Sequence, residues 1–193
     1  MKYTIKYLLV IFFILIGNTA VAQHTRNFTE EHLAAAEHLV YAIGIPESLI
    51  IPTERAIQLI QKSDPAKAHA LSAASKPFLG KQLIGSSLKG FVASQLDAET
   101  CRKIADFWEG PVGRKFVAKQ VELLSSGNRS PLKFSHDEEE AMKSFEKTKA
   151  FQDFTAAMPK ILMKAQELAK EIKEKMSQRI SVEHSKNKLQ NPK

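Results

Sequence analysis

The chain has 193 residues, a single cysteine, Cys101, and a formal net charge of +7. One cysteine excludes an intrachain disulfide, so folding must depend on core packing. A single domain of this length is large enough to bury most of its apolar surface in a core. The basic excess is modest and no basic stripe is interleaved with aromatic residues, which argues against a nucleic-acid partner.

The first 22 residues have the three-part layout of a secretory signal peptide. Two lysines precede the apolar run Leu8–Ile16, and the small residues Ala20 and Ala22 form the cleavage site before Gln23. The run is shorter than the roughly 18 apolar residues that a membrane span requires. We therefore predict an exported bacterial protein, periplasmic or secreted, whose mature chain starts at Gln23 and loses two lysines, for a net charge of +5.

The mature sequence predicts an all-α fold. Helix-forming residues dominate, glycine and proline fall between segments, and no strand-length run alternates apolar and polar residues. We expect one compact bundle of about six to eight helices over residues 23–184, with a long C-terminal helix. A disordered tail is expected at 185–193.

The first predicted helix starts after Thr29, which caps a first turn containing two glutamates, and it ends at Gly44. Two prolines follow, Pro46 and Pro52, and each suits the first position of a helix. We therefore expect a short turn at 47–50 and a separate helix that begins at Pro52.

Residues 66–75 are expected to form a short helix, and the segment after Pro77 has an apolar side that three glycines weaken. Asp97 is placed as the cap of the next helix. That helix ends at Gly110-Pro111, where another helix starts.

The loop 125–131 is the clearest break in the mature chain, and the helix that follows Ser135 has four acidic residues in its first turn. The last helix is long, and its apolar residues recur about every three and a half positions, which is typical of a seam against a partner surface. The seam consists of Ile161, Ala165, Leu168, Ile172, Met176 and Ile180.

A shift of 38 residues superposes two predicted helix pairs and suggests an internal repeat. The alternative is coincidence, because amphipathic helices share their periodicity by construction. The matched positions are Glu99, Ile104, Phe107, Phe116, Ala118 and Leu124 with Asp137, Met142, Phe145, Phe154, Ala156 and Leu162.

The stretch Leu96–Phe116 resembles the core of an exported bacterial family catalogued as domain of unknown function 2059. In that family an acidic helix ends in an aromatic pair, followed by a small residue, proline, a small apolar residue, glycine and a basic residue. Those places are taken here by Phe107, Trp108, Gly110, Pro111, Val112, Gly113 and Arg114. The family-like core is about 96–168, and it departs from the pattern in the second helix pair, which lacks a Gly-Pro turn. The resemblance implies a small, exported, helical protein and brings no activity with it.

The same segment supplies the candidate interaction site, a corner between two helices. It consists of Phe107, Trp108, Gly110, Pro111, Gly113, Arg114 and Lys115. In one interpretation the corner is structural, with its aromatic residues in the core and its basic residues in solvent. In the other, the aromatic residues anchor a partner protein.

Other residues that suggest chemistry have weaker patterns. Cys101 lies near a helix start, which favours a thiolate, but its alignment with the apolar side predicts a buried and inert thiol. His32 and His38 are six residues apart, so about 240° of helical rotation separates them. No zinc-protease, nucleophile-elbow or phosphate-loop motif occurs in the sequence. We therefore predict no catalytic, metal-binding or cofactor-binding residue.

Residues 164–193 carry a net charge of +4. This basic stretch is either an ordinary solvated helix face or a surface that binds an anionic membrane. The sequence favours a protein-interaction module that binds another protein of the cell envelope. The alternatives are a carrier of an apolar ligand or a peripheral binder of an anionic membrane surface, and an enzyme of unrecognised class comes third.

Overall fold

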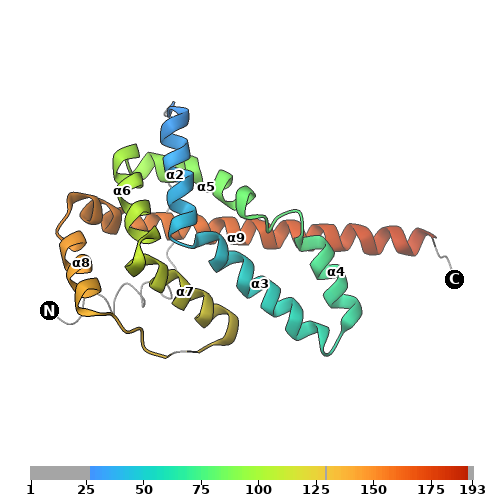
Figure 1. Cartoon of the computed structure of the whole chain (residues 1–193). Coiled ribbons are helices and arrows are strands. Elements are labelled where there is room, and N and C mark those ends of the chain that lie inside the picture. The colour runs from blue at the N-terminus through green and yellow to red at the C-terminus, as the bar shows by residue number, and fades with distance from the viewer. Residues whose placement is uncertain (1–26, 129, 191–193) are drawn as a thin grey trace.

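The computed structural model describes residues 27–128 and 130–190, with side chains up to Val182. These ranges hold eight helices and no strand, so the predicted all-α class, the number of helices and the long C-terminal helix are confirmed (Figure 1). The predicted signal peptide and its cleavage site at Ala20, Ala22 and Gln23 lie outside the described residues. The helices are α2 (Glu30–Ala42), α3 (Ile45–Gln61), α4 (Pro65–Ser75), α5 (Lys81–Gln95), α6 (Ala98–Glu109), α7 (Pro111–Ser126), α8 (His136–Glu146) and α9 (Lys149–Gln190).

The centre of the bundle is α2, which packs against both α5 and α6. Its cap is Thr29, whose Oγ1 accepts a hydrogen bond from the backbone N–H of His32 at 3.2 Å. The first part of α9 completes the core, where Phe154 and Ile161 are buried. The buried residues of α2 share one side of the helix and are Ala35, Ala36, Leu39 and Val40.

The connection from α2 to α3 depends on Gly44, whose φ of +74° lies in the left-handed region that glycine adopts without steric cost. From there α3 runs without a break, so the predicted division into a turn at 47–50 and a helix from Pro52 is wrong. Pro52 lies inside α3 at an exposed position. The hydroxyl of Thr53 donates to the carbonyl of Leu49 at 3.0 Å. This hydrogen bond is one residue along the helix from Pro52, which has no N–H to donate.

Two glycines lie within α5, and one of them is needed for packing. A Cβ added at Gly85 would lie 2.5 Å from Cζ of Tyr41 in α2, much closer than a normal contact. Glycine at this position therefore makes room for the tyrosine ring where α2 and α5 meet, which offsets its cost in a helix interior.

The last helix, α9, has 42 residues and is therefore about 63 Å long at the rise of an α-helix. It contacts α6, α5 and α4 along its length (Figure 1). The helix continues past His184 to Gln190, so the tail predicted at 185–193 does not begin at 185. Helix-forming residues continue to that point, and the next helix breaker is Pro192.

Candidate functional site

The predicted corner is a tight joint between α6 and α7. Gly110 separates the two helices, and its N–H donates to the carbonyl of Phe107 at 3.1 Å. Three residues later, a Cβ added at Gly113 would lie 2.5 Å from the carbonyl carbon of Trp108. The two backbones therefore cross at a distance that only glycine permits.

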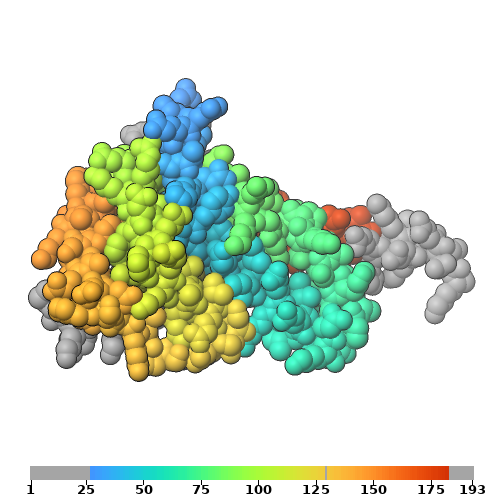
Figure 2. All heavy atoms as spheres, in the orientation of Figure 1, coloured from blue at the N-terminus to red at the C-terminus, as the bar shows by residue number. Residues whose placement is uncertain are grey.

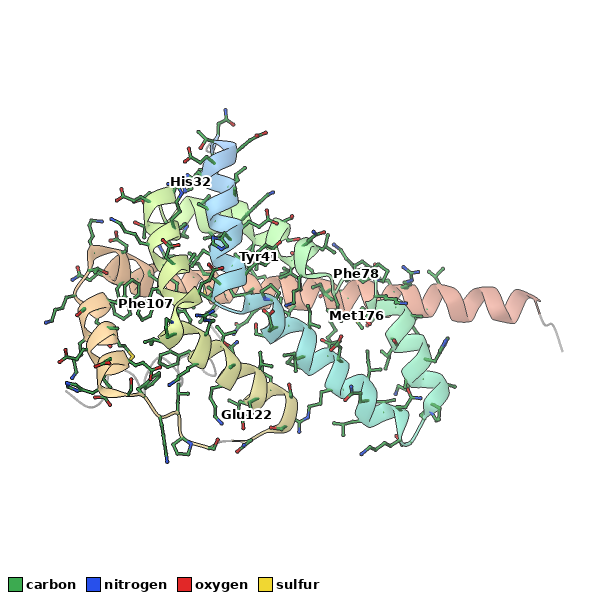
Figure 3. The ribbon with its side chains drawn as sticks, viewed as in Figure 1. His32, Tyr41, Phe78, Phe107, Glu122 and Met176 are labelled. Carbon is green, nitrogen blue, oxygen red and sulfur yellow. The ribbon has the colours of Figure 1, made fainter. Side chains whose placement is uncertain are left out.

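Phe107 does not stand free as an anchor for a partner. Its ring, labelled in Figure 3, stacks on Phe145 of α8, with centroids 3.9 Å apart and planes 8° from parallel. Phe145 in turn meets Phe151 of α9 edge-on at 5.6 Å. The half-buried Phe107 thus joins α6 to the helix pair α8 and α9.

Trp108 is also half-buried and packs against the core. Its ring lies 5.7 Å from that of Phe116 in α7, and Phe116 lies 5.1 Å from Phe134 in the loop before α8. The aromatic side chains of the corner therefore contact neighbouring helices and loops, as the structural interpretation expects.

The two basic residues of the corner are exposed. Lys115 Nζ lies 2.7 Å from Oε2 of Glu138 at the start of α8. The hydrogen bond from Lys115, together with that from the backbone N–H of Ser135, lowers the pKa of Glu138 below its ordinary value. Lys115 therefore ties α7 to α8, while Arg114 extends into solvent.

Cys101 is completely buried, as the sequence predicts. Burial, together with the nearby Asp97 carboxylate, raises the pKa of the thiol to about 12. The nucleophilic thiolate is the form that reacts, so this side chain is chemically quiet at neutral pH.

The two histidines of α2 contact different parts of the molecule. His32 Nε2 lies 2.7 Å from the carbonyl oxygen of Leu96, and His38 Nε2 lies 2.7 Å from Oε1 of Glu109. Among the described residues, no three His, Cys, Asp or Glu side chains are grouped so that they could hold a metal ion.

A polar cluster between α2 and α5 was not predicted. Glu37 accepts hydrogen bonds from Tyr41 Oη at 2.8 Å, Ser86 Oγ at 2.9 Å and Lys89 Nζ at 3.2 Å. Burial alone would raise the pKa of Glu37, but these three donors lower it below its ordinary value. Burial and the bond to Glu37 raise the pKa of Tyr41 to about 12. The pairing of a carboxylate with a tyrosine four residues later was the available signal, whereas the α5 donors are 49 and 52 residues away.

Two surface hollows meet at the junction of α5 and α6. The larger has a volume of about 430 Å³ and lies beside Phe28, His32 and residues 93–97. The smaller, about 240 Å³, lies across Leu96 and Asp97 and reaches Lys160. Both are open to solvent and partly polar, unlike the enclosed apolar spaces that hold lipid-sized ligands.

Charge is strongly segregated along the molecule. Residues 65–96 contain four lysines and no acidic residue, and α9 from Lys160 to Val182 has a net charge of +3. By contrast, α2, α6 with its cap Asp97, and α8 have net charges of −3, −2 and −4, although α7 between α6 and α8 has a net charge of +2. Figures 1 and 2 show α4 and the later part of α9 at one end of the molecule, and α6 and α8 at the opposite end.

We define the basic end as α4, the start of α5 and α9 from Lys164 to Val182. Several of its lysines are exposed and have no carboxylate partner among the described side chains. The acid-free stretch between Asp64 and Asp97 was visible in the sequence, but patterns read within single helices do not reveal it. The unpaired lysines are Lys67, Lys76, Lys170, Lys173 and Lys175.

Among the described residues, no single helix has both the length and the apolar composition to cross a membrane. Together α2 and α3 would pass this test, but they are bent by 46° against each other. No protein-family model, no curated protein and no solved structure matches the chain. The resemblance of Leu96–Phe116 to an exported family therefore remains a prediction.

Proposed function

We propose that this chain is an exported, non-catalytic binding protein of the bacterial cell envelope that engages an anionic partner through its basic end. The observation that carries the proposal is the segregation of charge between α4 with the later part of α9 and α2, α6 and α8. The binding surface is then the basic end instead of the corner at Phe107–Lys115, whose aromatic rings contact other helices.

Screening makes the local charge matter more than the net charge. The Debye length at physiological ionic strength is about 8 Å, whereas α9 alone extends for about 63 Å. A partner at the basic end is therefore shielded from the acidic residues of α6 and α8. It meets unpaired lysines on two neighbouring helices, α4 and α9.

The proposal is tested by adding the purified mature protein to washed bacterial envelopes and measuring the fraction that sediments with them. We expect retention at low ionic strength and release at high ionic strength, because the attraction is between exposed charges. Changing Lys67, Lys76, Lys173 and Lys175 together to Gln should abolish retention.

The matched control removes four exposed positive charges from the opposite end. It changes Arg114, Lys133, Lys143 and Lys147 to Gln, and so alters the net charge by the same amount. This variant should be retained like the unmodified protein. Equal loss of retention in both variants would contradict the proposal, because it would make the net charge or the corner decisive.

A further inference from the structure

We infer that the anionic partner is a lipid surface, which α4 and α9 approach with the lysines of the basic end. This inference rests on the proposed function and specifies the partner. It depends on three features of the basic end: its residue types, the distribution of charge around α9, and the positions of its exposed aliphatic side chains.

The residue types differ from those that anchor protein partners. Hot spots of protein interfaces are rich in tryptophan, tyrosine and arginine. Residues 65–96 and 160–182 contain no tryptophan or tyrosine and one arginine, Arg179, against nine lysines. A flexible lysine can contact the phosphates of a diffuse lipid headgroup layer in many positions. The rigid, forked guanidinium of arginine instead suits a fixed, bidentate contact with a carboxylate.

The charges around α9 are arranged with the glutamates away from α4. At about 100° per residue, the three glutamates of 160–182 fall in one sector about 60° wide, opposite the seam. Lys170 and Lys173 lie on one side of that sector, and Lys164 and Lys175 lie on the other. The seam residues Ile172 and Met176 are buried, where α4 packs on α9.

Four lysines of α9 are therefore placed between its glutamates and α4, two on each flank, whereas Lys160 lies within the glutamate sector. The exposed Lys67 and Lys76 of α4 add to them. A flat anionic surface that lies against α4 and one flank of α9 thus meets the lysines of that flank before it meets the glutamates.

The large apolar side chains that remain most exposed in the described part of the chain lie on helices that form or adjoin this end. They are Leu59 (60 % exposed), Leu83 (47 %) and Val182 (53 %). Leu59 is near the end of α3, just before α4, Leu83 is in the first turn of α5, and Val182 is on α9. Isolated aliphatic side chains among lysines match the composition of surfaces that enter the headgroup region of a bilayer.

The first test uses sedimentation with protein-free vesicles of phosphatidylglycerol and phosphatidylcholine. We expect binding that increases with the phosphatidylglycerol fraction and disappears in pure phosphatidylcholine. The fourfold Lys→Gln variant at 67, 76, 173 and 175 should bind at least about tenfold more weakly, since each lysine near an anionic surface contributes severalfold to partitioning. The control variant at 114, 133, 143 and 147 should bind like the unmodified protein.

A second measurement asks which surface faces the lipid. Because Cys101 is buried, a thiol-reactive, polarity-sensitive dye can be attached selectively to Val182→Cys or, as a control at the opposite end, to Lys143→Cys. The dye emission at position 182 should shift to the blue on phosphatidylglycerol vesicles, whereas that at position 143 should not change. A shift at 143 alone, or equal shifts at both positions, would overturn the assigned orientation.

Failure of the lipid inference is distinguishable from failure of the proposed function. Suppose that envelopes retain the unmodified protein but not the Lys→Gln variant, and that the protein binds vesicles of no composition. This result would reject the lipid inference and indicate that the partner is an acidic macromolecule. Binding to neither envelopes nor vesicles would reject both.

Discussion

At the scale of single residues, Gly113 is the described glycine at which an added Cβ would come closest to other atoms, 2.2 Å from Cα of Trp108. A side chain at this position has no flexible neighbour to displace, because the atoms that it would meet belong to the main chain of α6. The joint between α6 and α7 can therefore accommodate a side chain only if the helices move apart. Such a movement would also disturb the contact of Trp108 with Phe116.

We predict that Gly113→Ala lowers the free energy of unfolding by about 1–3 kcal/mol, the usual range for overpacking. Urea denaturation followed by circular dichroism measures the change. The control is Gly90→Ala in α5, where an added Cβ meets nothing within 4 Å. This control should raise the free energy of unfolding by about 0.5–1 kcal/mol, because alanine is the better helix former. A neutral Gly113→Ala would show that the helices separate without cost.

Glu37 makes stability depend on pH. Its pKa is lower in the folded protein than the ordinary 4.5, so its ionisation stabilises the fold above that value. This contribution is lost as the pH falls through the lowered pKa of the folded state. Glu37→Gln should therefore reduce the free energy of unfolding by about 1–2 kcal/mol at pH 7, and the difference should disappear in acid.

The measurement is urea denaturation of both proteins across the acidic range. The exposed Glu54→Gln in α3 serves as a control and should match the unmodified protein at every pH. A Glu37→Gln deficit that persists unchanged in acid would mean that packing, and not the ionised carboxylate, accounts for the effect.

At the scale of helices, the starts that the sequence predicted are those with a local cause. Asp97 Oδ1 accepts from the N–H of Thr100 at 2.7 Å, and Ser135 forms a capping box with Glu138. Such caps are readable because all their atoms lie within four residues. The continuous α3 could not be read in this way, because a proline at a helix start and one inside a helix look alike in sequence.

The 38-residue repeat matches the helix starts of the structure. The caps of α6 and α8, Asp97 and Ser135, differ by this shift, and so do the first residues of α7 and α9. In the first pair, Gly110 N–H donates to the carbonyl of Phe107. In the second, Thr148 N–H donates to the carbonyl of Phe145 at 2.9 Å. The second pair thus makes the corresponding backbone hydrogen bond without a Gly-Pro sequence.

The equivalent residues Phe107 and Phe145 stack on each other and so join the two helix pairs. The pairs differ at the crossing, where Gly113 corresponds to Phe151, whose ring contacts Phe145. The sequence identified the corner residues and gave their structural role as one of two interpretations, but it did not identify what Phe107 contacts. That role depends on Phe145, which lies 38 positions away.

At the scale of the whole molecule, the helices differ in how much apolar surface they bury, just as they differ in charge. The helix α2 lies between α5 and α6, and its buried side includes Leu39 and Val40. By contrast, α4 buries three small residues, Ala68, Ala74 and Ser75. Small side chains let α4 come close to α9 but remove little apolar surface from water, so α4 gains little free energy from packing.

We predict that native-state hydrogen exchange separates these regions. Amides of α2, α5 and α6 should exchange only through global unfolding, whereas those of α4 should exchange through local opening at a lower free energy. Ala68→Gly should lower the opening free energy of α4 by about 1 kcal/mol without altering exchange in α2. Equal protection in α2 and α4 would instead show a single cooperative unit. The helix α4 packs on α9, whose seam residues Ile172 and Met176 are buried. Local opening of α4 would therefore also expose apolar surface of α9 between its flanking lysines, at the end proposed to meet the membrane.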